Sequence, residues 1–131
     1  MEMAVAERIV AERTIRELHE ARVRGDIRAL CQLFVDNGRF EIMGASADKP
    51  ISIRATGLAA FRPWLTMMVK AFRVSDYALL SLVVEWPRAT AHWRADIHSK
   101  ITGVTVPTEL VDLVELRDDR ILTYSEFFVP R

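Results

Sequence analysis

Four long strand-like segments fill the second half of this chain and constrain its fold more than any other feature. They are rich in β-branched and aromatic residues, and they cover residues 73–86, 89–101, 108–116 and 121–129. The stretches "WPR" and "RDDR" between neighbouring segments are typical of tight turns. Strands joined by tight turns pair antiparallel, so the sequence predicts a meander that must cover one of its faces with other elements.

The first half of the chain supplies helices that can cover this face. Apolar residues recur at helical spacing over residues 3–24. Gly25 is typical of the position just after a helix, and Asp26 of the cap that starts the next one. That second helix, "IRALCQLFV", is predicted to end near Val35.

A third helix is predicted over residues 58–72, with Gly57 at its start. Pro63 would disturb a regular helix interior, so we expect a bend there or a later start. The stretches "RFEIMG" and "ISIRA" are read as two short strands. The whole chain, residues 1–131, is therefore predicted to be a single α+β domain, with three N-terminal helices packed on a bent antiparallel sheet.

The bulk composition narrows the classes of function. Eighteen basic and eighteen acidic residues give a formal net charge of zero, which offers no electrostatic reason to expect nucleic acid or a membrane as partner. The one cysteine, Cys31, cannot form an intrachain disulfide, and we read it as a small buried residue in a reducing compartment. No signal peptide and no bilayer-length apolar segment are visible, so a cytoplasmic protein is expected.

Residues 92–98 read "HWRADIH" and raise the question of which strand face is buried. Side chains alternate along a strand, so the stretch separates into a titratable and an apolar face. The titratable face holds His92, Arg94, Asp96 and His98, and the apolar face holds Trp93, Ala95 and Ile97. The titratable face is either solvated or lines a cavity in which these groups act on a bound molecule.

The order of elements is similar to that of the nuclear-transport-factor-2-like superfamily. The likeness rests on "RGDIRALCQLFVDNGRFEI", a glycine opening the third helix, and "LVDLVELRDDRILTYSEFF", and it covers about residues 5–129. The superfamily includes ketosteroid isomerases, limonene epoxide hydrolases and SnoaL-like polyketide cyclases. The resemblance implies a cone-shaped, cystatin-like fold with an apolar pocket, and dimerisation through the outer sheet face.

Resemblance to the epoxide hydrolases implies a catalytic trio. Their Arg-x-Asp pair matches Arg94 and Asp96, and their second acid matches Glu126. One carboxylate would activate water, a carboxylic acid would protonate the epoxide oxygen, and the arginine would hold both. The positions that hold the water in those enzymes fall on Phe40 and Ile42, neither of which can bind water.

Resemblance to the ketosteroid isomerases adds a different acid. Asp112 falls near their oxyanion-binding aspartate, but their tyrosine falls on Leu18 and their proton-shuttling aspartate on Ile42, so steroid-type isomerisation is rejected. His19 is expected on the polar, solvated side of the first helix. The residues expected to line the pocket and contact a substrate are Asp112, His92, Tyr124, Phe128, Phe40, Ile42, Leu18, Trp64 and Met68.

Three functions remain open at this point. The first is a cofactor-independent enzyme that uses acid/base chemistry on a small, mostly apolar molecule with a polar group, either hydrolysing a strained ring or shifting a proton. The second is a non-catalytic binder of such a molecule, and the third is a dimeric partner module with an almost closed core. No cofactor and no metal site are predicted. The expected homodimer would bury an outward-facing stripe, assisted by Trp86 and made of Ala91, Trp93, Ala95 and Ile97.

Overall fold

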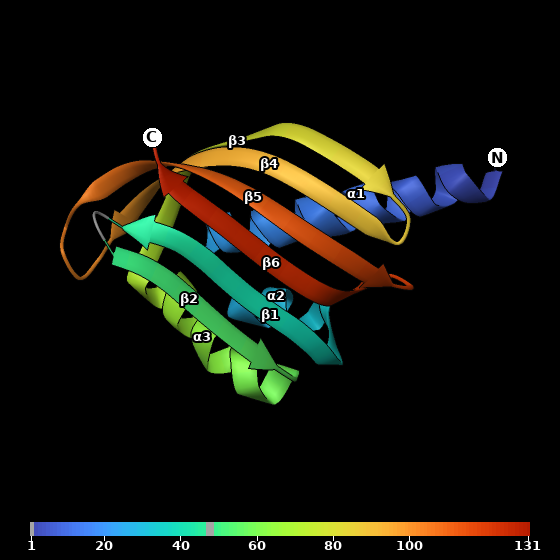
Figure 1. The fold of residues 1–131 in the computed structure, drawn as a ribbon, viewed down its shortest axis with the longest axis horizontal. Helices are drawn as coiled ribbons and strands as arrows, with labels where there is room; N and C mark the ends of the chain where they lie inside the picture. Colours follow the sequence, from blue (N-terminus) through green and yellow to red (C-terminus); the bar gives the residue numbers. More distant parts are fainter. Residues whose placement is uncertain (1, 47–48) are drawn as a thin grey trace.

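The computed structural model describes residues 2–46 and 49–131, and within these residues three helices lie against one six-stranded sheet (Figure 1). The helices are α1 (Glu2–Arg24), α2 (Ile27–Gln32) and α3 (Leu58–Ala71). The strands are β1 (Phe34–Ser46), β2 (Lys49–Thr56), β3 (Phe72–Glu85), β4 (Arg88–Ser99), β5 (Thr105–Arg117) and β6 (Arg120–Pro130). The predicted α+β class is confirmed.

The predicted junction between the first two helices is confirmed, whereas the predicted end of the second helix is not. Gly25 follows α1 with a φ of 74°, a conformation that glycine adopts without strain, and the Asp26 side chain accepts a hydrogen bond of 3.0 Å from the Ala29 amide. The second helix is shorter than predicted, because the chain is already extended at Phe34. The third helix begins at Leu58 and not later, so Pro63 lies inside it.

The strand order across the sheet is β2-β1-β6-β5-β4-β3. The neighbouring pairs are antiparallel except that β1 runs parallel to β6, so the predicted antiparallel arrangement holds for four of the five strand pairs. No hairpin joins β1 to β6, so no turn signal in the sequence could set their relative direction. This pairing nevertheless places β6, with its predicted acid, in the middle of the sheet.

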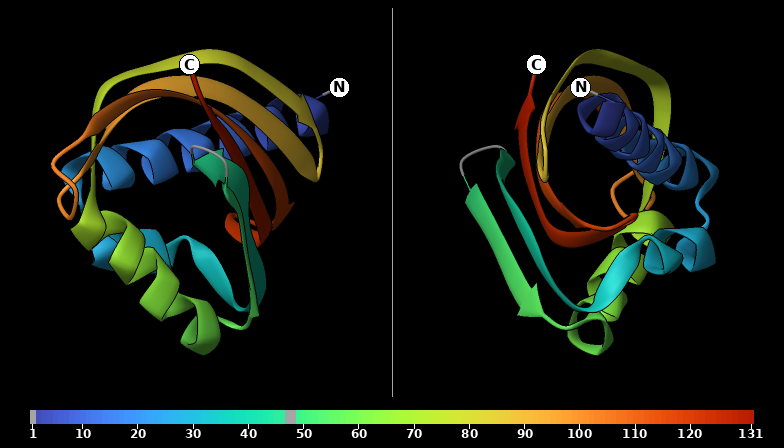
Figure 2. Two further views of the ribbon diagram at one scale, coloured as in Figure 1. Left: turned by 60° about the vertical axis from the view of Figure 1, so that its left-hand side comes forward. Right: turned by 90° about the vertical axis from the view of Figure 1, so that its right-hand side faces the viewer.

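The sheet is strongly curved and wraps around α1, as the two views of Figure 2 show. Helix α3 packs against β1 and β2, where the sheet turns away from α1. The concave face holds the apolar core, including Ile15 and Leu18 of α1, Phe61 of α3 and Phe40 of β1. Along a regular strand, alternate residues therefore point either at the helices or at the outside of the cone.

Within the described ranges, no helix has both the length and the apolar character needed to cross a membrane. The cytoplasmic location stays a prediction.

Candidate functional site

The stretch "HWRADIH" lies on β4 with the opposite orientation from the one predicted. Trp93 is 1% exposed and Ala95 is fully buried, so the apolar face points into the cone. Arg94 and Asp96 are half-buried on the outer face, and the expected contact of these two side chains with Glu126 is wrong. Burying an indole and an alanine is favourable, whereas burying charged groups is costly, and this difference decides which face turns inward.

The same reversal affects the predicted dimer stripe and one predicted pocket residue. Ala91, Trp93 and Ala95 are buried against the core, and Trp86 packs against it, so these residues do not form an exposed surface. His92 lies on the outer face, where its Nε2 is 2.9 Å from Oε1 of Glu109. It therefore does not line the interior.

Two carboxylates predicted from the sequence do meet inside the cone. Asp112 of β5 is fully buried and Glu126 of β6 is 3% exposed. The two residues face each other in the β5–β6 register. Around them lie side chains from α1, β3, β4 and β6, and we call the whole set the buried polar cluster: His19, Arg22, Tyr77, Trp93, Asp112, Tyr124 and Glu126.

Glu126 is held by two donors at one oxygen. Its Oε2 accepts a hydrogen bond from Nη1 of Arg22 and another, 2.5 Å long, from the Tyr124 hydroxyl. The Arg22 guanidinium carbon also lies 5.2 Å from the centre of the Trp93 ring, within the range of a cation–π contact. Arg22, which was not among the predicted site residues, therefore binds Glu126 in the way that was predicted for Arg94.

Asp112 is held in the same way at one oxygen and is free at the other. Its Oδ2 lies 2.8 Å from Nε2 of His19 and accepts a 3.0 Å hydrogen bond from the Trp93 indole. Its Oδ1 has no hydrogen-bond partner among the described residues. A buried carboxylate oxygen without a partner costs free energy, so it marks the place in the cluster where another polar group fits best.

The electrostatics of the cluster follow from its burial. Burial raises the pKa of Glu126 and Asp112 adds to the rise, while the Arg22 guanidinium and the Tyr124 hydrogen bond oppose it. Burial also raises the pKa of Tyr124 well above its usual value, and the neighbouring Asp112 and Glu126 charges reinforce this. For Arg22 burial acts to lower the pKa, but the nearby Glu126, Tyr124 and Asp112 together outweigh it and the net shift is upward. The cluster thus combines a firmly cationic arginine with a carboxyl group whose pKa is raised by its burial.

The other predicted pocket residues divide into two groups. Phe40 stacks on Tyr124 with a ring-centre distance of 6.0 Å, and Ile42 lies beside Glu126 in the β1–β6 register. Three further predicted residues, Leu18, Met68 and Phe128, are buried in the core or packed against it. Trp64, by contrast, is 40% exposed on α3 and is not part of the cluster.

The cluster is covered by side chains. A hollow of about 380 Å³ lies between the ends of α1 and α2 and the β5–β6 turn, and another of about 450 Å³ lies at the β3–β4 turn. Neither hollow is lined by a member of the buried polar cluster. Among the described residues, no group of three or more His, Cys, Asp or Glu side chains is arranged to hold a metal ion.

Two of the cluster residues on α1 could have been found from the sequence. Arg22 continues the stripe of buried residues formed by Ala11, Ile15 and Leu18 at spacings of three and four. A charged residue on such a stripe is a signal of a buried partner. His19 was expected in solvent but is 1% exposed, because it lies at the edge of this stripe where β3 and β4 cover α1. Tyr77 had no comparable signal.

The family of this chain follows from a match that covers most of its sequence. The model of the SnoaL-like domain matches residues 15–124. The chain belongs to the SnoaL-like domain family. This assignment confirms the predicted membership of the nuclear-transport-factor-2-like superfamily.

Solved structures agree on the fold. A candidate isomerase from Bacillus subtilis has a TM-score of 0.80 at 21% identity, covering 93% of this chain and 88% of that one. An LEH-like epoxide hydrolase from M. tuberculosis has a TM-score of 0.73 at 15% identity, covering 92% and 83%. A candidate polyketide cyclase from Sinorhizobium meliloti has a TM-score of 0.61 at 20% identity, covering 86% and 92%. None of the curated proteins matches the sequence. At these identities the likeness shows the fold and leaves the activity open.

Proposed function

We propose that this SnoaL-like protein is a cofactor-independent acid/base enzyme that moves a proton on a small, mostly apolar carbonyl compound. The observation that carries the proposal is the pairing of Asp112 and Glu126 inside the cone, where one oxygen of Asp112 has no partner in the described part of the chain. Buried charges rarely improve stability over a well-packed apolar core, so their presence favours a chemical role.

The two carboxyl groups are suited to opposite tasks. Asp112 receives two hydrogen bonds at Oδ2, which orient its free Oδ1 to accept a proton from a substrate carbon or hydroxyl. Arg22 and Tyr124 both occupy Oε2 of Glu126, so a proton on that acid resides at Oε1 and can be donated to a substrate oxygen. The raised pKa of Glu126 extends the pH range in which this acid carries a proton.

Proton transfer fits the cluster better than hydrolysis of an epoxide. Hydrolysis needs polar groups that position a water molecule, and the residues at the corresponding positions, Phe40 and Ile42, are 1% and 5% exposed apolar side chains. Phe40 also stacks between Phe61 and Tyr124. We therefore favour isomerisation or cyclisation through an enol over addition of water to a strained ring.

Deuterium exchange tests this proposal with a panel of compounds in place of an identified substrate. The protein in D₂O would be mixed with small ketones and 1,3-dicarbonyl compounds, and exchange of their α-hydrogens would be followed by NMR. We expect faster exchange of at least one compound, and a loss of about 10²–10⁴-fold in Asp112→Asn, the range typical of removing a general base. Asp96→Asn is the matched control on the outer face and should retain the full rate.

A second candidate is a non-catalytic small-ligand-binding dimer. It is favoured by the coverage of the cluster, since neither described hollow reaches it. In that case a compound of the panel would raise the melting temperature of the wild-type protein but not of Asp112→Asn, and no α-hydrogen would exchange. Exchange that is equally fast in wild type, Asp112→Asn and Asp96→Asn would contradict the enzyme proposal.

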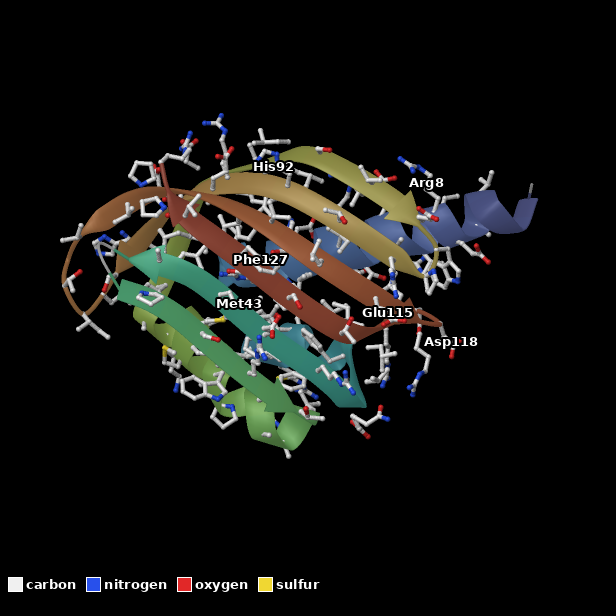
Figure 3. All side chains as sticks on the ribbon, viewed as in Figure 1. Arg8, Met43, His92, Glu115, Asp118 and Phe127 are labelled. Atoms are coloured by element: carbon white, nitrogen blue, oxygen red, sulfur yellow. The ribbon has the colours of Figure 1, made fainter. Side chains whose placement is uncertain are left out.

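We also infer a homodimer, formed through the outer face of the sheet. Met43, Phe127 and His92 lie in one row across β1, β6 and β4 on the side facing away from the helices (Figure 3). Phe127 is 37% exposed and the nearby Leu113 is 43% exposed, so an apolar centre is available there. Light scattering at micromolar concentration should report twice the 15.0 kDa chain mass, and Phe127→Asp should halve that value.

A further inference from the structure

His19 connects the buried carboxylates to a tyrosine nearer the surface. Its Nε2 is 2.8 Å from Oδ2 of Asp112, and its Nδ1 is 2.6 Å from the hydroxyl of Tyr77. A carboxylate only accepts hydrogen bonds, so this contact requires the proton on Nε2 whenever Asp112 is in its carboxylate form. In the neutral ring Nδ1 is then the acceptor, and the Tyr77 hydroxyl donates to it. Three groups thus form one continuous row of hydrogen bonds.

The row runs from the interior of the cone towards solvent. Asp112 is fully buried and His19 is 1% exposed, whereas Tyr77 is only half-buried. Tyr77 is also close enough to the exposed side of α1 for Arg16 and Glu20 to influence its hydroxyl. Of the three groups, the tyrosine is therefore the one within reach of water.

A local irregularity of β3 directs Tyr77 to this position. The register between β3 and β4 shifts between Ser75 and Ala78, and Asp76 has a φ of 50°. In a regular strand the side chain on the same face as buried Val74 would be Asp76. The extra residue turns Tyr77 inward instead, in the way that β-bulges often redirect a side chain. The bulge places Asp76 in the left-handed backbone region, which is unfavourable for a residue other than glycine.

We propose that Tyr77 and His19 form a proton path between solvent and Asp112. For inward delivery, the Tyr77 hydroxyl gives its proton to Nδ1 of His19, and Nε2 of the same ring releases its proton to Oδ2 of Asp112. A hydronium ion then supplies a proton to the Tyr77 oxygen and is left as water. The tyrosine and the imidazole each end with as many protons as they began with, and the imidazole proton now lies on Nδ1. The reverse sequence starts from the Nδ1-protonated ring that inward delivery leaves behind, and it carries a proton from Oδ2 of Asp112 to water.

The Tyr77 hydroxyl can pass on a proton without remaining ionised. Burial raises the pKa of Tyr77 to about 12, so the hydroxyl remains protonated near neutrality. It can accept one proton while it gives up another, and no phenolate is left behind. The inference deepens the proposed function, because it gives the proposed base a route for exchanging protons with solvent, but the path can be tested without any substrate.

The first experiment measures how fast the Nε2 proton of His19 exchanges with water. The full chain would be labelled with ¹⁵N-histidine and the exchange rate obtained by NMR magnetisation transfer. Tyr77→Phe removes only the hydroxyl, so the path predicts exchange several-fold slower than in the wild type. If the Tyr77 bond were merely structural, its loss would loosen the ring and exchange would be unchanged or faster, and that result would overturn the proposal.

Tyr124→Phe is the matched control, since it removes the same atom within the cluster but from Glu126 and not from His19. Its His19 exchange rate should equal that of the wild type, and an equal slowing in both variants would overturn the path. The ¹⁵N chemical shifts of the His19 ring in the wild-type protein test the direction of the hydrogen bonds without any variant. They should report the Nε2-protonated form of His19, and a proton on Nδ1 would contradict the row of bonds described above.

Failure of the path and failure of the proposed function give different results. If Tyr77→Phe slows His19 exchange but no compound of the panel exchanges its α-hydrogens, the path stands and the enzyme proposal fails. If a compound exchanges and the His19 rate is unaffected by Tyr77→Phe, the enzyme proposal stands and the path is wrong.

Discussion

Replacing Arg22 with methionine would remove a buried positive charge while keeping an unbranched apolar side chain in its place. The Arg22 side chain is 9% exposed and bonds to Glu126, whose side chain is 4% exposed. Removing one partner of a buried ion pair typically costs about 3–5 kcal/mol, because the other charge stays buried without compensation. The contact with the Trp93 ring adds roughly 0.5–2 kcal/mol to the loss.

The size of this loss should depend on pH in a defined direction. Burial already raises the pKa of Glu126 above its unfolded value, and removing Arg22 takes away the largest opposing effect. Because the pKa of Glu126 is higher in the folded than in the unfolded state, protonation of this group stabilises the fold. This stabilisation is complete below the unfolded pKa of 4.5 and is lost as the pH rises through the folded pKa. Arg22→Met should therefore be much less destabilised near pH 5 than near pH 8.

Urea unfolding followed by tryptophan fluorescence measures these differences. The double variant Arg22→Met with Glu126→Gln should recover most of the loss, because no charge is then left buried. Arg16→Met is the control, since the Arg16–Glu12 pair is 3.1 Å long but 55% and 41% exposed and should contribute no more than about 1 kcal/mol. The reasoning fails if Arg22→Met is as stable as the wild type near pH 8, or if the double variant is no more stable than the single one.

Three further predictions follow from other contacts. A Cβ at Gly44 would lie 2.6 Å from the Phe128 ring, so Gly44→Ala should displace that ring and lower the unfolding free energy by about 1–3 kcal/mol, as measured by urea titration. Trp93→Ala should lower the free energy of unfolding by at least about 3–5 kcal/mol, whereas Arg94→Ala should change it by no more than about 0.5 kcal/mol. If Arg94→Ala were the more destabilising of the two, the titratable face of β4 would have to point inward. Burial raises the pKa of the Cys31 thiol, so its modification by a thiol reagent should need a higher pH than that of free cysteine, and equal pH profiles would contradict this.

Much of the fold can be predicted from the sequence because it depends on local patterns. Alternation over the second half of the chain, with turns at "WPR" and "RDDR", predicted four of the strands, and Gly25 and Asp26 marked the junction of the first two helices correctly. The family likeness also led correctly to Glu126 and Asp112 as interior acids. These two acids lie among apolar residues on their own strands, so their sequence neighbours already carry the signal of burial.

The orientation of β4 shows the limit of this reasoning. Alternation separates Trp93 and Ala95 from Arg94 and Asp96, but alternation is the same whichever face turns inward. The choice depends on the free energy of burying each set against α1, and the apolar set is favoured. Positions taken from a resemblance at low identity could not replace this comparison.

The composition of the cluster was decided only by the tertiary structure. His19 lies 93 residues before its partner Asp112, and Arg22 lies 104 residues before its partner Glu126. No local pattern reports which charges meet across such separations. Tyr77 depends in addition on a bulge that reverses the alternation of β3. The sequence thus determined the elements and the two acids through local periodicity, whereas the groups that hold these acids were selected by the curvature of the sheet around α1, because an ionisable side chain is buried only where another element brings it a partner.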